Sequence, residues 1–143
     1  MFNKLTVTVA VASTLFLTAC SNKDLFLTNK PDVALTNTYW KAMEFYDTKV
    51  PVIGKEAHIK FDKKLRINGV LGCNNFFGSY QIDKNTIDFF QIGTTKMMCQ
   101  NIKTEDTFSK ILQETKTYKI EGETLYFFDK NAKEISTFKA IYF

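Results

Sequence analysis

From residue 37 onward, apolar and polar positions alternate with a period of two along most of the chain. Adjacent side chains of a strand point to opposite faces, so this alternation predicts half-buried strands. Short polar turns such as 62–64 and 121–123 separate several of them. The predicted strands cover residues 39–45, 56–61, 65–71, 78–82, 86–92, 116–121, 123–128 and 134–142. About eight strands with short links predict a mainly β, antiparallel sheet that curls into a barrel or sandwich.

One segment, residues 104–115, departs from this alternation and predicts a single helix. Thr104 is a suitable residue to cap its start, and Glu105 and Asp106 complement the positive end of the helix dipole. A lone amphipathic helix must bury its apolar stripe, so we expect it to pack over one end of the sheet. The positions at helical spacing are Phe108, Ile111, Leu112 and Thr115.

The first 19 residues have the composition of a secretory signal rather than of the fold. Lys4 precedes an uncharged stretch, 5–19, that is rich in Val, Leu, Ala and Thr. A membrane-spanning helix needs about 20 predominantly apolar residues, so a short true anchor is the weaker interpretation. Removal of these 19 residues from the 143 leaves 124, the length of one domain.

The apolar stretch ends in Leu-Thr-Ala-Cys at residues 17–20, which resembles the lipobox of bacterial lipoproteins. In that class the chain is cut before the cysteine and the cysteine is acylated, so the resemblance implies that Cys20 anchors the protein in a membrane. Two or more acyl chains give stable attachment. Residues 20–35 then form the acylated cysteine and a polar tether interrupted by Pro31, and residues 36–143 form the domain.

The charge of the chain excludes some partners. The net charge of +4 becomes +3 once Lys4 leaves with the signal, and the lysines are scattered rather than gathered in a basic run. We therefore expect no nucleic-acid binding. Ser21 and Asn22 follow the anchor without the aspartate that marks inner-membrane retention in enteric bacteria, so we expect the outer membrane, with the domain facing the periplasm.

Three Phe-Phe pairs, at 76–77, 89–90 and 127–128, indicate apolar residues on both faces of the sheet. The second face is either covered by the helix and long loops or lines a groove for an apolar ligand or partner. Met97 and Met98 fit either a flexible binding surface or core filling. The residues predicted for such a face are Phe76, Phe77, Phe90, Met97, Met98, Phe127 and Phe128.

Two cysteines, Cys73 and Cys99, remain after the anchor. An even number of cysteines in an exported chain indicates a disulfide. A metal site is the weaker interpretation because the single histidine, His58, stands apart, and a free reactive thiol is the other alternative. Around Cys73, Gly72 and Gly78 permit unusual backbone angles and the asparagines between them can stabilise a turn.

Several motifs in order resemble the META domain, the HslJ-like family of bacterial envelope proteins. They are Thr-Tyr-Trp-Lys at 38–41, Gly-Val-Leu-Gly-Cys-Asn-Asn-Phe-Phe-Gly-Ser-Tyr at 69–80, Thr-Thr-Lys-Met-Met-Cys at 94–99, and Tyr-Lys-Ile-Glu-Gly-Glu-Thr-Leu at 118–125, with Glu105, Phe108 and Leu112. Asn131 and Ala132 stand where a glycine is expected in a turn.

This resemblance implies a small antiparallel, barrel-like fold with a helix, similar to the cracked barrels of secretion pilotins. It also implies a role in envelope stress or drug tolerance, without catalytic residues to carry over. The residues agree, because His58 is expected to face water and no nucleophile motif surrounds it. We therefore expect no enzyme and no cofactor, but a lipoprotein that binds or stabilises another envelope component. The alternative is a carrier or sensor of a small hydrophobic ligand.

Overall fold

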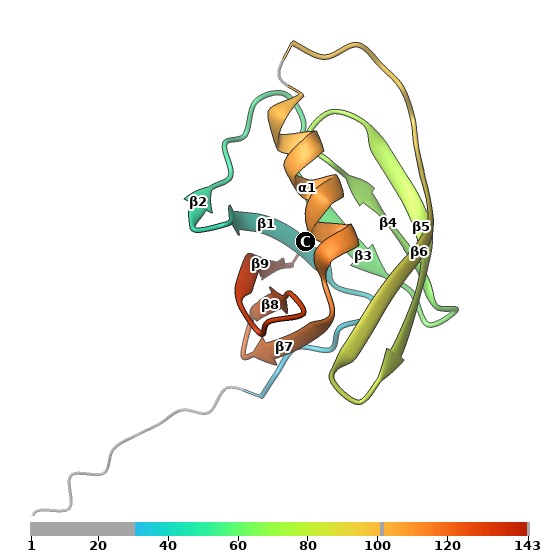
Figure 1. Ribbon diagram of the computed structural model, residues 1–143, viewed down its shortest axis with the longest axis vertical. Coiled ribbons are helices and arrows are strands. Elements are labelled where there is room, and N and C mark those ends of the chain that lie inside the picture. The colour runs from blue at the N-terminus through green and yellow to red at the C-terminus, as the bar shows by residue number, and fades with distance from the viewer. Residues whose placement is uncertain (1–30, 101, 143) are drawn as a thin grey trace, which may run out of the picture.

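The computed structural model describes residues 31–100 and 102–142. Within these ranges it has nine strands and one helix, and the strands form one antiparallel sheet that closes on itself (Figure 1). The elements are β1 (Tyr39–Phe45), β2 (Thr48–Lys49), β3 (His58–Phe61), β4 (Arg66–Val70), β5 (Asn75–Asp83), β6 (Thr86–Thr94), α1 (Lys103–Glu114), β7 (Thr117–Glu121), β8 (Thr124–Phe128) and β9 (Glu134–Ile141). The signal segment, Cys20 and most of the predicted tether lie outside the described residues.

The sheet follows chain order from β2 and β1 through β3 to β9, and β1 also pairs with β9 to close the ring. The ring is weakest between β6 and β7, where, among the described residues, the strands share the single pair Thr86 and Thr117. This arrangement confirms the predicted mainly β, barrel-like fold with one helix, and its open seam matches the cracked barrel that the family resemblance implies.

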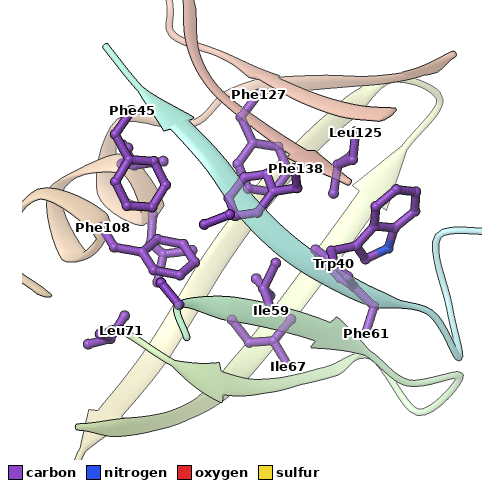
Figure 2. Close-up of a cluster of buried hydrophobic side chains, with 14 of the residues drawn as sticks. Trp40, Phe45, Ile59, Phe61, Ile67, Leu71, Phe108, Leu125, Phe127 and Phe138 are labelled. Atoms are coloured by element: carbon purple, nitrogen blue, oxygen red, sulfur yellow. The ribbon is translucent and has the colours of Figure 1, made fainter. Parts of the chain in front are cut away.

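The interior of the ring is filled by large apolar side chains (Figure 2). Trp40, Ile59, Phe127 and Phe138 have no exposed surface. Burying a side chain of this size contributes about 1.5–3 kcal/mol, so this core is the main source of stability. The alternation that predicted the strands is the cause, because β3 and β8 turn every second residue inward, as β1 does up to its bulge after Ala42 and β9 does from Ser136 onward.

Helix α1 packs into this core through Phe108, Ile111 and Leu112. The ring of Phe108 lies 5.0 Å from that of Phe45 in β1 and 5.6 Å from that of Phe138 in β9. The predicted packing of the helix against the sheet is therefore correct, but the predicted cap is wrong. The helix begins one residue earlier, its N-cap is Ile102 without a side-chain cap bond, and Thr104 lies in the first turn.

Three further details differ from the sequence predictions. Strand β2 is only two residues long, too short to show an alternation. Strand β5 begins at Asn75 instead of 78, because Gly78 lies at an irregularity in the β5–β6 pairing and does not end the strand. Asp32, assigned to the tether, lies on the domain and accepts a hydrogen bond from the Gly122 N–H at 2.7 Å.

Candidate functional site

The loop between β4 and β5, residues 71–74, is tied to the segment that follows β6 by two kinds of contact. The first is a disulfide between Cys73 and Cys99, whose Cα atoms lie 6.4 Å apart and which encloses a sequence separation of 26 residues. Glu105 lies within reach of both sulfurs, as a metal-ligating group would. A disulfide sulfur is not a thiolate, however, and the thiolate is the form that binds metals, so this cluster is not suited to hold an ion.

The second contact is the buried side chain of Asn74, which is 3% exposed. Its Oδ1 accepts hydrogen bonds from the Met97 N–H at 2.7 Å and the Thr95 hydroxyl at 2.9 Å. Its Nδ2 donates to the Met97 carbonyl and to Oε1 of Glu105, and its backbone N–H donates to Oε2 of Glu105 at 3.0 Å. Every polar atom of the side chain is therefore bonded, and the loop is scaffold rather than an active site.

Gly72 completes this scaffold. Its φ of +116° lies in the region that favours glycine, and a Cβ at this position would come within 3.0 Å of the Thr104 methyl group in α1. The glycine therefore allows both the turn after β4 and the close approach of the helix.

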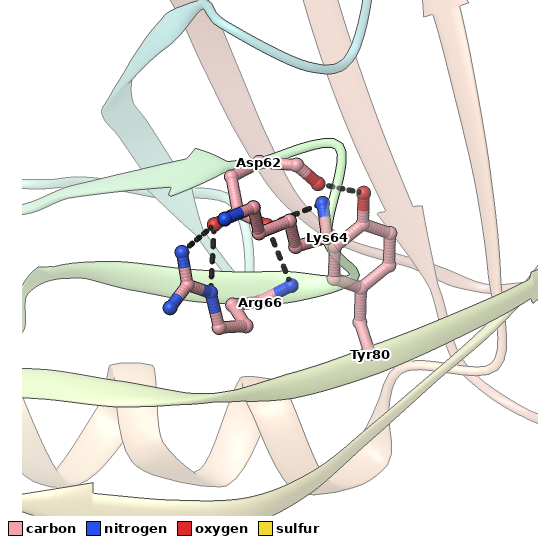
Figure 3. Close-up of polar contacts among 4 residues, drawn as sticks. All are labelled: Asp62, Lys64, Arg66 and Tyr80. Atoms are coloured by element: carbon pink, nitrogen blue, oxygen red, sulfur yellow. Dashed lines mark hydrogen bonds and ion pairs between the residues drawn. The ribbon is translucent and has the colours of Figure 1, made fainter.

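The carboxylate of Asp62, in the turn between β3 and β4, also has a structural role, because it holds this turn together (Figure 3). It accepts hydrogen bonds from the backbone N–H groups of Arg66 at 3.0 Å and Lys64 at 2.8 Å, and it pairs with the Arg66 guanidinium. These bonds, led by the one from the Arg66 N–H, hold the pKa of Asp62 below its ordinary value. The Tyr80 hydroxyl donates to the Asp62 carbonyl at 2.9 Å. A carboxylate held in this way shapes the turn and is a poor proton acceptor.

His58 lies on the face of β3 opposite Ile59 and Phe61, as the sequence predicted, but it is only partly exposed to water. Its ring is half-buried and stacks on Tyr39, with centroids 4.2 Å apart and planes inclined by 21°. Its Nδ1 lies 3.1 Å from the Glu56 carbonyl. Burial lowers the pKa of His58 below 6.5. This packing explains the residue without a catalytic role.

The structure divides the seven residues of the predicted apolar face among four places. Phe76 and Phe127 are core residues, 1% and 0% exposed, and the interpretation of these two as surface residues is wrong. Met97 and Met98 are exposed on the segment after β6, and Phe128 is half-buried beside Tyr126 with ring centroids 6.4 Å apart. Phe77 and Phe90 are exposed on the adjacent strands β5 and β6, where Phe77 is paired with Gly93 and Phe90 with Ser79.

Phe77, Phe90 and Ile92 form what we call the outer patch, on the outer face of β5 and β6. Their exposed fractions are 61%, 42% and 38%. The Phe77 ring lies over Gly93, because a Cβ there would come within 2.6 Å of the ring. Ile92 lies over Gly78 in the same way. The second phenylalanine face is thus neither covered by the helix nor folded into a cleft, and the two glycines allow its side chains to lie flat.

One cavity lies at a place that the sequence did not indicate. It is a groove of 390 Å³ between the β1–β2 hairpin and the first half of α1, which we call the hairpin–helix groove. The residues that line it are Phe45, Tyr46, Thr48, Lys49, Val50, Pro51, Lys103, Thr104 and Thr107. The hairpin is too short to be read from alternation, so no local pattern could have identified these residues.

Tyr46 joins the two walls of the groove. It lies in the hairpin turn at a φ of +46°, followed by Asp47 at +60°, a conformation that costs a non-glycine residue roughly 1–2 kcal/mol. Its hydroxyl donates to Oε2 of Glu114 at 2.6 Å, and the ammonium of Lys110 lies 5.2 Å from the ring centroid. Burial, together with the bond to Glu114, raises the pKa of Tyr46. Helix α1 thus holds the hairpin turn in place.

Within residues 31–100 and 102–142, the only helix is too short and too polar to span a membrane.

Comparison with solved structures finds the same fold in distant proteins. An NMR structure of a protein from Burkholderia xenovorans is 19% identical, covers 98% of this chain and 99% of its own length, and gives a TM-score of 0.59. A second NMR structure is 23% identical over 73% of this chain and 90% of its own, with a TM-score of 0.61. A crystal structure of a DUF4847 family protein from Bacteroides vulgatus is 15% identical over 73% and 93%, with a TM-score of 0.56. These identities show a shared fold alone.

The sequence itself matches the family model of the META domain over residues 33–141. The matched region begins at Val33, whose backbone N–H donates to the Gly122 carbonyl at 2.8 Å. The curated proteins give no match.

Proposed function

Since this chain belongs to the META domain family, which is not a known enzyme family, we propose that it is a non-catalytic binding protein of the cell envelope. In this proposal the chain is exported, cut before Cys20 and held by acyl groups at the outer membrane, with the domain in the periplasm. There it binds or stabilises another envelope component, in a response to envelope stress or drugs.

The pairing of Cys73 with Cys99 supports export, because disulfides persist in oxidising compartments. The polar residues that are candidates for catalysis already make structural contacts within the fold, and this supports a non-catalytic role. Asn74, Asp62 and His58 each hold a turn, a strand or a ring in place, and their contacts leave none of them positioned as an acid, base or nucleophile.

The observation that carries the binding role is the outer patch. Phe77 is 61% exposed on β5 and Phe90 is 42% exposed on the adjacent strand β6, and exposed apolar side chains on neighbouring strands of a small domain are typical of a site of protein contact. Aromatic residues are enriched at such contacts. The patch lies on two adjacent, hydrogen-bonded strands of the sheet, β5 and β6.

Photo-crosslinking in living cells tests this role. A photoreactive amino acid at position 77 should capture a specific envelope protein, and the double change of Phe77 and Phe90 to serine should remove the function of the protein without unfolding it. Val52 is a matched control, since it is 59% exposed but lies in the loop after β2. Equal capture from positions 77 and 52 would show that the outer patch is not the binding surface.

The anchor is tested separately. Labelling with a fatty-acid analogue should mark the wild-type protein in the membrane fraction and should be lost when Cys20 is changed to serine. A wild-type protein that stays soluble and unlabelled would exclude the anchored location, whatever the outer patch binds.

A second candidate function is the carriage or sensing of a small hydrophobic ligand, and the hairpin–helix groove favours it. The groove, of 390 Å³, lies at the small end of the range of ligand sites. The native mass of the purified protein should then exceed the denatured mass by that of the ligand. Identical masses after purification from cell envelopes would count against a carrier.

A further inference from the structure

We infer that a second groove in the fold binds a neutral sugar. The groove has a volume of 560 Å³, within the range of small-molecule sites, and lies where the start of β1, the β3–β4 hairpin and the end of β9 meet. We call it the β3–β4 groove. It shares no lining residue with the outer patch or the hairpin–helix groove, so this inference goes beyond the proposed function.

One wall of the β3–β4 groove is a row of side chains across the outer face of the sheet. Lys60 in β3 lies opposite Tyr39 in β1 on one side and opposite Asn68 in β4 on the other. Ile141 in β9 continues the row beyond Tyr39. Side chains that face each other across paired strands have Cβ atoms about 4.5–5.5 Å apart. Four strands therefore present one continuous surface to a ligand.

Two amide side chains in this groove are available to a ligand. Asn37 and Asn68 are both exposed, and within residues 31–100 and 102–142 neither side-chain amide is bonded to another residue. An amide offers two donors and an acceptor, whereas a hydroxyl both donates and accepts. Each amide can therefore bind neighbouring hydroxyl groups of a sugar in both directions. Asn74 differs, because all its polar atoms already have partners in the fold.

Tyr142, just after β9, brings an aromatic ring to the same groove. The residue is 64% exposed. An aromatic ring has an electron-rich face, which attracts the slightly positive hydrogens of C–H groups. A sugar ring presents such C–H groups on its faces and carries its hydroxyl groups around the rim. A sugar stacked on Tyr142 therefore keeps its hydroxyls free to reach the amides.

The β3–β4 groove has no net charge. Among its lining residues only Lys60 and Asp62 are charged, one of each sign. The Asp62 carboxylate also accepts bonds from the Lys64 and Arg66 N–H groups and pairs with the Arg66 guanidinium (Figure 3). A charged ligand gains no net electrostatic attraction from such a lining. A neutral ligand rich in hydroxyl groups fits it.

A peptide is another neutral, polar ligand, but the strands of this groove do not suit one. Extended peptides commonly bind by adding a strand to an exposed sheet edge. Tyr39, Lys60 and Asn68 each pair with a neighbouring strand on both sides, so the described strands offer no free edge at these positions. The groove therefore fits a sugar better than a peptide.

The walls of the groove are held by bonds within the fold. The Asn37 N–H donates to the Phe61 carbonyl at 3.0 Å, and the Tyr80 hydroxyl donates to the Asp62 carbonyl at 2.9 Å. Asn37 has a φ of +60°, a conformation that asparagine tolerates better than most residues. A wall that is ordered before binding reduces the entropy that the ligand must overcome.

A set of small probes separates the contributions of the ring and the hydroxyl groups. The disaccharides cellobiose and diacetylchitobiose, the open-chain polyol sorbitol, the ring alcohol cyclohexanol and a tetraalanine peptide are each titrated into the full chain carrying Cys20→Ser, which removes the proposed acylation site. We expect at least one disaccharide to shift the amide NMR signals of Asn37, Asn68 and Tyr142 to saturation. Sorbitol lacks the ring and cyclohexanol lacks most of the hydroxyls, so each should bind at least about fivefold more weakly.

Matched variants locate the site. Asn68→Ala and Tyr142→Ala should each weaken disaccharide binding about three- to tenfold. Tyr142→Phe keeps the ring and should bind within about twofold of the wild type. The controls Asn131→Ala and Phe90→Ala remove an exposed amide and an exposed ring outside the groove, and each should change the affinity by no more than about twofold.

Several results would overturn the inference. One is that neither disaccharide shifts the signals of the groove. Another is that sorbitol, cyclohexanol or tetraalanine binds there at least as tightly as the better disaccharide. Disaccharide binding that survives both Asn68→Ala and Tyr142→Ala would place the sugar elsewhere on the protein. None of these results bears on the outer patch or the hairpin–helix groove, because the three sites have no lining residue in common.

Discussion

Asn74 and Glu105, 31 residues apart in the sequence, are joined by two hydrogen bonds to the two oxygens of one carboxylate. The pair fastens the loop after β4 to the first turn of α1. Asn74→Ala should lower the free energy of unfolding by about 2–3 kcal/mol, because it leaves the Met97 N–H and one oxygen of a part-buried carboxylate without a partner. Urea denaturation measures the loss.

The neighbouring asparagine provides the control for this prediction. Asn75 is exposed, so Asn75→Ala should change the free energy of unfolding by no more than about 0.5 kcal/mol. Similar losses for the two substitutions would mean that the network around Asn74 does not stabilise the loop.

The disulfide should contribute about as much to the free energy of unfolding as the Asn74 side chain does, but through its effect on the unfolded chain. Replacing both Cys73 and Cys99 with serine should lower the free energy of unfolding by about 3–4 kcal/mol, because a link across 26 residues restricts the unfolded chain. Thermal unfolding of the wild type with and without reductant should reproduce the same difference. A wild type that is equally stable when reduced would show that the link adds nothing.

One substitution in the turn between β8 and β9 should make the folded protein more stable. Ala132 has a φ of +60°, where a side chain costs roughly 1–2 kcal/mol, and Asp129 holds the turn through bonds from the Asn131 and Lys133 N–H groups. Ala132→Gly should raise the free energy of unfolding by about 0.5–1 kcal/mol after the greater flexibility of the unfolded glycine is included. The same substitution at Ala34, which lies outside the positive-φ positions, should not stabilise the protein.

The single histidine gives a direct test of pH dependence. Burial lowers the pKa of His58 below 6.5, so the folded state disfavours its charged form. The stability that this contributes is present above pH 6.5 and is lost as the pH falls through the folded-state pKa. NMR titration should show a midpoint below 6.5. Tyr39→Ala removes the stacked ring and should return the midpoint toward that value, whereas a wild-type midpoint above 6.5 would contradict the burial of the ring.

Local patterns predicted the elements well where one face of a strand is buried. Strand β1 occupies residues 39–45 as expected, because the buried Trp40 and Ala42 alternate with more exposed neighbours before a bulge shifts the register ahead of Phe45. The core residues Phe108, Ile111 and Leu112 were found from helical spacing for the same reason. Each of these predictions depends on neighbours within one element.

The candidate sites depend on residues that are distant in sequence, and here local patterns failed. Nothing near Tyr46 indicates that Glu114 lies beside it, 68 residues later. The sequence placed both Phe76 and Phe77 on the predicted apolar face, and only the pairing of β5 with β6 shows that Phe76 is buried while Phe77 is exposed next to the strand that carries Phe90. The hairpin–helix groove and the outer patch form only when distant elements come together as the sheet closes. The alternation of apolar and polar residues within one strand does not show which elements will meet.

That closure also sets the order of events when the chain folds. Strand β1 pairs with β9, the last strand, only after all the intervening strands have been made, so the core that Trp40 shares with Phe138 cannot be completed early. Pairing over so long a separation slows folding. During synthesis the chain therefore stays without its final enclosure until the last strand is available, and the apolar side chains of the interior stay open to solvent for that interval.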